Sequence, residues 1–166
     1  GDGTWAVASL LMWFASVLLV GSFAGNPALP GADAAAAALR RPMGVFAITR
    51  HPMMWAFAVW AVVHLAIWPT PENHILATTM LLLALGGSAG QDAKKARLMG
   101  DAWRGWARRT AFIPFTGQFS GRIPWAEAWP GAVALGGGTL IWLLFTWAHV
   151  PLGARVAAGV WRWVGG

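Results

Sequence analysis

The sequence predicts an all-α membrane protein with about four transmembrane helices and a cytoplasmic amphipathic helix. Of its 166 residues, 57% are hydrophobic and only 11% are charged, whereas a soluble domain carries about 25% charged residues. A water-soluble fold of this size cannot hide so much apolar surface. Four apolar segments are close to or above about 17 residues, the shortest length that crosses a bilayer.

The four predicted spans form a single transmembrane domain. They cover about residues 5–24, 52–68, 74–89 and 132–150. None has Asp, Glu, Lys or Arg in its interior, and each is expected to be helical because lipid offers no partners to free backbone groups. Since the chain begins with Gly1, we expect a native N-terminal helix to precede it.

The basic residues define an orientation for these spans. Ten of the 12 Lys and Arg residues lie within residues 25–51 and 90–131, the two connections that share one side if the helices alternate in direction. The positive-inside rule places both connections in the cytoplasm. We therefore expect a multi-pass protein of the bacterial inner membrane. The net charge of +6 then reflects cytoplasmic loops and not nucleic-acid binding.

The 13 tryptophans are expected to form belts at the two membrane interfaces. The outer belt would contain Trp5, Trp68 and Trp147, and the inner belt Trp55, Trp103, Trp106, Trp125 and Trp129. Residues 92–110 combine many bases with apolar side chains, a pattern that suits a helix lying on an anionic inner leaflet. Its expected apolar anchors are Leu98, Met99, Trp103 and Trp106.

Three of the four histidines are expected at one membrane depth. His51 and His64 are 13 residues apart on one helix, which separates them by ~20 Å and turns them to different faces. His64, His74 and His149 fall at the outer ends of their spans. His64 and His149 can face each other as axial ligands of a haem iron. The alternative is that each histidine only bonds a carbonyl near a helix end.

A polar cluster is expected at the cytoplasmic end. It contains Arg50, His51, Asp92, Arg104, Arg108 and Arg109. Pro52 suits the first turn of a helix, and the free amides there, with Arg50 and His51, can hold an anion or a carboxylate. The alternative is that these bases only anchor the loops to lipid phosphates.

Four motifs resemble the NnrU family of bacterial membrane proteins, whose superfamily includes zeta-carotene isomerase. They are ITRHPMMWAFAVWAVVHLA, ARLMGDAWRGWARRTAFIPF, SGR and TWAHVPLG, and the resemblance runs from about residue 5 to 153. It implies a link to denitrification and nitrogen-oxide metabolism. The isomerase relatives hold haem b through histidine, and His51, His64 and His149 fall within shared motifs. Of these, the expected depth favours His64 and His149.

A more distant resemblance is to membrane methyltransferases of the isoprenylcysteine carboxyl methyltransferase type. RHP followed by GDAWRGWARRTAFIP is similar to their S-adenosylmethionine motif, which implies that Arg50, His51, Asp92 and Arg108 surround that cofactor. The chain departs from the pattern, because Met54, Trp103 and Trp106 replace tyrosines.

The sequence thus supports three hypotheses and leaves open whether the protein is an enzyme. The first is an NnrU-like protein that binds haem b and acts in nitrogen-oxide metabolism or in redox handling of a lipophilic molecule. The second is an S-adenosylmethionine-dependent methyltransferase. The third is a structural or assembly subunit without a ligand. The expected partners are the lipid bilayer and a lipophilic small molecule or other membrane subunits.

Overall fold

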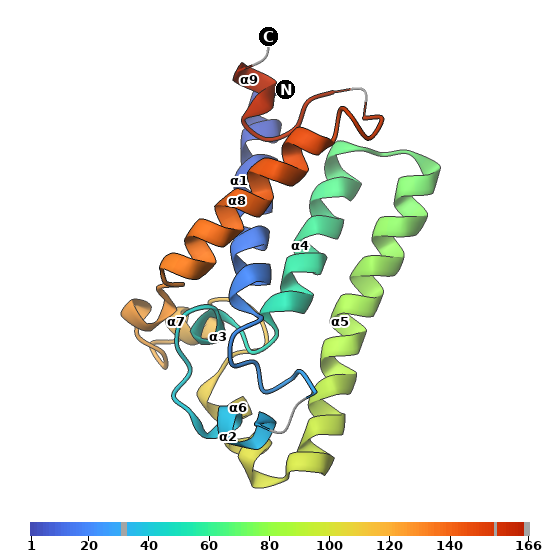
Figure 1. Cartoon of the computed structure of the whole chain (residues 1–166). Helices are drawn as coiled ribbons and strands as arrows, with labels where there is room; N and C mark the ends of the chain where they lie inside the picture. The colour runs from blue at the N-terminus through green and yellow to red at the C-terminus, as the bar shows by residue number, and fades with distance from the viewer. Residues whose placement is uncertain (31–32, 155, 165–166) are drawn as a thin grey trace.

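The computed structural model describes residues 1–30, 33–154 and 156–164, and within them the chain is helical and contains no strand. Four long helices run up and down in alternation, and the N-terminus and α9 lie at the same upper end (Figure 1). The long helices are α1 (Asp2–Gly21), α4 (Pro52–Ile67), α5 (Pro71–Met99) and α8 (Ala132–Ala148).

Short helices surround the lower end of this bundle (Figure 1). They are α2 (Ala34–Leu39), α3 (Val45–Ile48), α6 (Asp101–Arg109), α7 (Thr116–Phe119) and the 3-10 helix η1 (Trp125–Ala128). A further short helix, α9 (Trp161–Val164), lies at the upper end. The lower end is also where most of the basic residues gather, since they belong to the connections that meet there.

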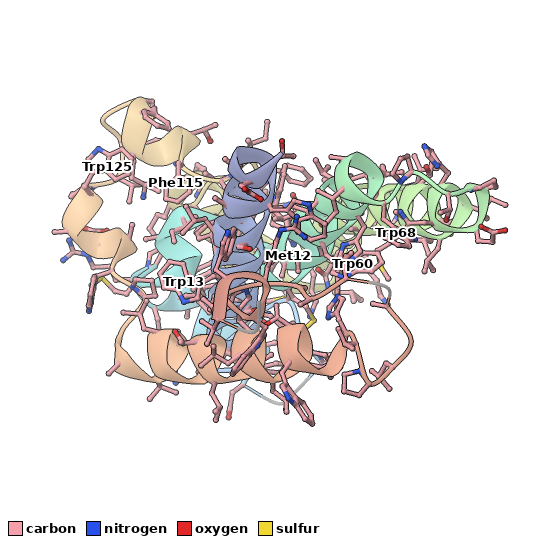
Figure 2. All side chains as sticks on the ribbon, turned by 90° about the horizontal axis from the view of Figure 1, so that it is seen from above. Met12, Trp13, Trp60, Trp68, Phe115 and Trp125 are labelled. Carbon is pink, nitrogen blue, oxygen red and sulfur yellow. The ribbon has the colours of Figure 1, made fainter. Side chains whose placement is uncertain are left out.

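Helix α1 is the centre of the bundle. It packs against both α4 and α8, while α5 packs against the other side of α4, as the view from above also shows (Figure 2). The core cluster at the lower half joins α1 residues such as Leu18 to Phe46 of α3 and to Trp103 and Trp106 of α6. The large indole rings fill the space that the small residues of α1 and α4 leave.

Among the described residues, one helix, α1, is both long and apolar enough to cross a membrane. Helices α4 and α8 are apolar but have 16 and 17 residues, which corresponds to lengths of about 24–26 Å. Their bounds lie close to the predicted segments 52–68 and 132–150.

The structure corrects the surface helix predicted over residues 92–110. Helix α5 continues without a break from Pro71 to Met99, so residues 92–99 belong to it. It ends at Gly100, whose φ of +55° favours glycine, and α6 begins at the next residue. The expected lipid anchors Trp103 and Trp106 are 1% and 2% exposed. They pack into the protein core and do not face outward.

The turn between α4 and α5 depends on Thr70. Its Oγ1 accepts a hydrogen bond from the Asn73 N–H at 3.3 Å, and the Asn73 amide donates to the carbonyls of His64 and Trp68 at 2.8 and 2.7 Å. We expect Thr70→Ala to lower the free energy of unfolding by about 1 kcal/mol, because an N-cap is lost. Exposed Thr78 within α5 supplies the control, and Thr78→Ala should not destabilise the protein in the same thermal melt followed by circular dichroism.

Candidate functional site

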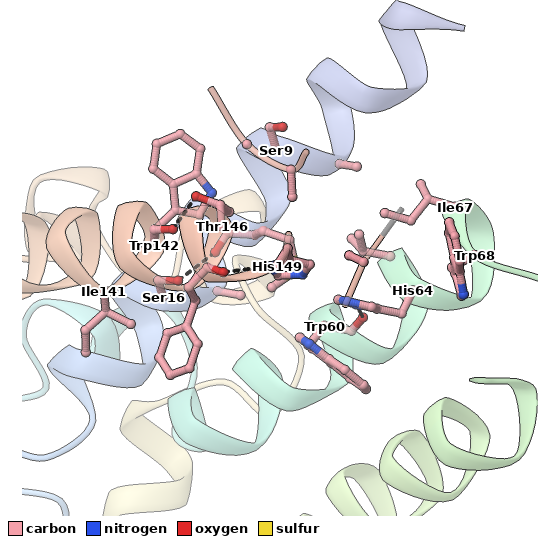
Figure 3. A pocket seen from close by; sticks show the side chains of 18 of the residues that line it. Ser9, Ser16, Trp60, His64, Ile67, Trp68, Ile141, Trp142, Thr146 and His149 are labelled. Carbon is pink, nitrogen blue, oxygen red and sulfur yellow. Dashed lines mark hydrogen bonds between the residues drawn. The ribbon is translucent and has the colours of Figure 1, made fainter. Parts of the chain in front are cut away.

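A cavity of about 610 Å³ lies in the upper half of the bundle, walled by α1, α4, α8 and parts of residues 152–159. Its lining is mainly apolar, with a few polar side chains that include Ser9 and Ser16 of α1. His64 enters it from α4, and His149, the C-cap residue of α8, enters it from the facing wall (Figure 3). Ligand pockets typically measure about 300–1,000 Å³ and have this mixed lining.

Hydrogen bonds fix the tautomer of both histidines. His64 Nδ1 lies 2.8 Å from the Trp60 carbonyl oxygen, and His149 Nδ1 lies 2.6 Å from the Phe145 carbonyl oxygen. A carbonyl oxygen only accepts, so each Nδ1 carries the proton and each Nε2 keeps its lone pair. Both carbonyls come from the residue four positions earlier, one helical turn below the ring. The two imidazoles therefore offer their Nε2 atoms as ligand nitrogens.

The separation of the two rings suits one metal ion between them. Their centroids are 6.4 Å apart, with an interplanar angle of 27°. An imidazole nitrogen binds a transition metal at about 2.0 Å and lies about 1.1 Å from its ring centre, so two ligands on opposite sides of an ion have centroids about 6.2 Å apart. Trp60 stacks on His64 with centroids 4.1 Å apart and restrains the plane of that ring.

A metal site built from protein ligands alone is not found in the part of the chain that the structure describes. No group of three or more His, Asp or Glu side chains comes together there to hold a metal ion. Two histidines with free Nε2 atoms are the donor set expected where a macrocycle supplies the four other ligands. The donor chemistry of the cavity therefore fits haem.

The other two histidines lie elsewhere. The Nδ1 of His74 also bonds the carbonyl four residues earlier, that of Thr70 at 2.8 Å, but the His74 side chain is exposed and does not line the cavity. His51 lies at the lower end of α4 and is 2% exposed. Of the three histidines expected at the outer depth, the structure brings His64 and His149 together and leaves His74 apart.

At the lower end, Arg50 and His51 hold the carboxylate of Asp92. Arg50 Nη2 donates to Asp92 Oδ2 at 2.6 Å and Arg50 Nε to the same oxygen at 2.9 Å. His51 Nε2 lies 2.8 Å from Asp92 Oδ1. Burial by itself raises the pKa of the Asp92 carboxyl, but the hydrogen bonds and charges of His51 and Arg50 outweigh it and hold that pKa below its usual value.

The remaining arginines of the predicted cluster point to other partners. Arg104 pairs with Asp101, and Arg109 donates to the Ala38 carbonyl at 2.7 Å. Arg108 is exposed on α6. The predicted carboxylate-binding site is therefore filled by the protein's own Asp92, which ties the start of α4 to the lower part of α5.

Sequence reasoning missed one residue that lines the upper cavity, Trp60, and one that lies beside it, Trp161. Trp60 both stacks on His64 and supplies the carbonyl that fixes its tautomer, and the spacing of four residues along α4 is the signal that could have identified it. Trp161 of α9 donates its Nε1–H to the Leu143 carbonyl at 3.1 Å and to Thr146 Oγ1 at 3.2 Å. It fixes the C-terminal segment beside the cavity, and no motif in the sequence indicates this contact.

Taken together, the fold and the cavity define a helical protein with two facing histidines in a largely apolar pocket. A family model with the description NnrU protein matches residues 1–156 of the 166-residue chain. The chain belongs to the NnrU family. Searches of curated proteins and of solved structures returned no match.

Proposed function

We propose that this NnrU-family chain is a membrane protein that binds haem b, with His64 and His149 as the axial ligands of the iron. The observation that carries the proposal is a pair of imidazoles in a largely apolar cavity, with ring centroids 6.4 Å apart. In each ring, Nδ1 donates to a backbone carbonyl, which leaves the Nε2 lone pair available for a metal. Haem iron with two axial histidines supplies one-electron chemistry. The carbonyls of Trp60 and Phe145 orient the two imidazoles and increase the basicity of their Nε2 atoms.

The surroundings of the cavity support a lipophilic environment. Helix α1 has the length and apolarity of a span, and α4 and α8 are shorter apolar helices. Large apolar side chains are exposed on the bundle, among them Leu10, Val62, Leu82, Leu140 and Leu144. Such extensive exposed apolar surface marks a protein that is covered by membrane or by other subunits. This pattern and the positive-inside rule support the proposal of a multi-pass protein of the inner membrane with its basic connections in the cytoplasm.

The biological role that we propose is redox handling of a small or lipophilic molecule, in the context of nitrogen-oxide metabolism. Membership of the NnrU family and the apolar lining of the cavity support this assignment. A methyltransferase function is the second candidate. The structure brings Arg50, His51 and Asp92 together as that hypothesis expects, but their hydrogen bonds go to one another, and the tyrosines of the methyltransferase pattern are replaced in this chain.

Absorption spectroscopy of the purified full chain tests the haem proposal. After expression with ample haem, we expect a Soret band typical of six-coordinate, low-spin iron. His64→Ala and His149→Ala should each remove the six-coordinate spectrum and weaken haem binding by more than about tenfold, since each removes an axial ligand.

His74→Ala is the matched control, because His74 has the same bond to the carbonyl four residues earlier but lies outside the cavity. It should retain the wild-type spectrum and affinity. The proposal is wrong if the wild type binds no haem under these conditions, or if His74→Ala reduces binding as much as His64→Ala does.

A further inference from the structure

A second surface, far from the cavity, combines exposed arginines with exposed aromatic rings. It comprises Arg108 and Arg109 at the end of α6, Arg122, and the aromatic side chains of Phe119, Trp125 and Trp129. We call these six residues the arginine–aromatic surface. The aromatic side chains are 79%, 56% and 68% exposed in that order, which is unusual for rings of this size.

The three arginines lie together at the C-terminal end of α6. Arg122 Nη1 donates to the carbonyls of Arg108 and Thr110, each at 2.9 Å. The guanidinium groups of Arg108 and Arg109 both bend toward Gly105, where their terminal nitrogens lie 3.9 and 3.2 Å from the position that a Cβ atom would take. Positive charge is favourable at this end of the helix, because the free carbonyls there carry partial negative charge.

The positive charges of these arginines are not neutralised by carboxylates. Within the described residues, none of the three forms a salt bridge, and the two nearest acids in sequence are engaged elsewhere, Asp101 with Arg104 and Glu127 with Arg41. Arg109 and Arg122 donate hydrogen bonds to backbone carbonyls, which satisfy some of their N–H groups but do not neutralise their positive charge. A concentration of guanidinium groups of this kind favours phosphate as a partner.

Two of the three aromatic rings, Phe119 and Trp125, contact each other. Trp125 stacks on Phe115 with centroids 5.9 Å apart and meets Phe119 edge-on at 5.3 Å. Phe115 and Trp125 lie together at the periphery of the bundle (Figure 2). Exposed tryptophan beside arginine is typical of the layer where a membrane meets water, because the indole is apolar with one polar N–H.

We propose that the arginine–aromatic surface binds the headgroups of anionic phospholipids at the lower end of the bundle. The guanidinium groups contact the lipid phosphates, and the rings of Phe119, Trp125 and Trp129 enter the interfacial layer. Trp103 and Trp106, which the sequence predicted as membrane anchors, are buried, and the arginine–aromatic surface provides that anchor in their place. The inference does not depend on haem binding, since it concerns the opposite end of the bundle.

Two other occupants fit part of the same chemistry. A free phosphate ion would satisfy the arginines but would leave the aromatic rings without a partner. An acidic protein could contact both the arginines and the rings, but a surface built for such a protein would show no preference between phosphatidylglycerol and phosphatidylcholine. A lipid is favoured because exposed arginines and exposed aromatic rings belong to one short stretch of the chain, with Arg122 between Phe119 and Trp125, and lipid phosphate lies directly above acyl chain in a membrane.

A lipid titration of the purified full chain in detergent tests the proposal. Short-chain phosphatidylglycerol and phosphatidylcholine with identical acyl chains are the probes, and isothermal calorimetry gives their affinities. We expect phosphatidylglycerol to bind more tightly, and Arg108→Gln to weaken it about fivefold, the effect of one surface charge. Within the described residues, the Arg108 side chain is exposed and forms no salt bridge, so an unchanged melting temperature should accompany the loss.

Arg104→Gln is the matched control, since it removes one charge from the same helix where Asp101 already neutralises it. It should change the affinity less than twofold. Trp129→Ala should weaken both lipids, whereas Trp147→Ala on α8, 55% exposed, should not. Equal binding of the two lipids to the wild type would overturn the proposal. So would an equal effect of the two arginine variants, or displacement of the lipid by inorganic phosphate at the same concentration.

Discussion

Gly138→Ala is expected to destabilise the protein by about 3 kcal/mol, although it adds only one methyl group. Gly138 lies on α8 where this helix crosses α1. A Cβ atom there would lie 2.7 Å from Val17 Cα and 2.8 Å from Val17 N. Both atoms belong to the backbone of α1, so no side-chain rotation can relieve the clash and the two helices must move apart.

The separation of α1 and α8 also affects the upper cavity. Trp13 Nε1 donates to Thr139 Oγ1 at 2.9 Å, one residue beyond Gly138, and this bond would lengthen. His149 lies three turns further along α8, about 16 Å along the helix axis. A shift of α8 would move His149 relative to His64, so Gly138→Ala should weaken haem binding as well as the fold.

The adjacent glycines provide an internal scale for this prediction. A Cβ atom on Gly136 would have no neighbour within 4 Å, and one on Gly137 would lie 3.0 Å from Val20 Cγ1. Gly136→Ala is expected to stabilise the helix by up to about 1 kcal/mol, and Gly137→Ala to have a small effect because the valine side chain can turn. Denaturant titration followed by circular dichroism measures all three. An equal response of Gly136 and Gly138 would show that α1 and α8 are not in close contact.

The sequence could not distinguish these three glycines, since it contains no information on which one faces α1. The sequence did place His64 and His149 near the same end of the bundle, because hydropathy locates the apolar segments and the helical rise then sets each residue's position along the axis. The two rings meet in the structure because α4 and α8 run in the same direction on neighbouring sides of α1.

Hydropathy gave a poor account of α5 and α6 for a physical reason. The apolar pattern ends near residue 89, but the helix continues to Met99, because helix formation does not require apolar side chains and tolerates charged residues such as Asp92 and Lys94. In α6 the sequence pattern predicts an apolar face, but it does not tell whether protein or lipid packs against that face. The protein core covers Trp103 and Trp106, and a membrane would produce the same periodicity.

Asp92→Asn is expected to lower the free energy of unfolding by about 2–3 kcal/mol, because it removes the charge that Arg50 and His51 hold. The side chains of Arg50 and Asp92 are 15% and 20% exposed, which reduces the cost below that of a fully buried pair. The amide keeps the shape of the carboxylate and one acceptor, so Asp92→Ala should cost more. Either change loosens the contact between the start of α4 and the lower part of α5.

The effect of Asp92→Asn should depend on pH. The folded protein holds the pKa of Asp92 below its usual value, which is about 3.9 in an unfolded chain. The stabilising contribution is therefore complete above that value and is lost as the pH falls through the lowered pKa of the folded state. The difference between wild type and Asp92→Asn should shrink as the pH falls below about pH 5.

Asp101→Asn separates this effect from the general response of the protein to acid. Asp101 also pairs with an arginine, but its side chain is 94% exposed, so its removal should change stability little. Subtracting each variant from the wild type cancels the titration of groups outside the pair concerned. A difference for Asp92→Asn that stays constant into strong acid would mean that the carboxylate gains nothing from Arg50 and His51. The contact between α4 and α5 would then depend on apolar packing. The lower end of α4 would be held by other hydrogen bonds, such as those that Thr49 and Trp55 donate to the Phe112 carbonyl.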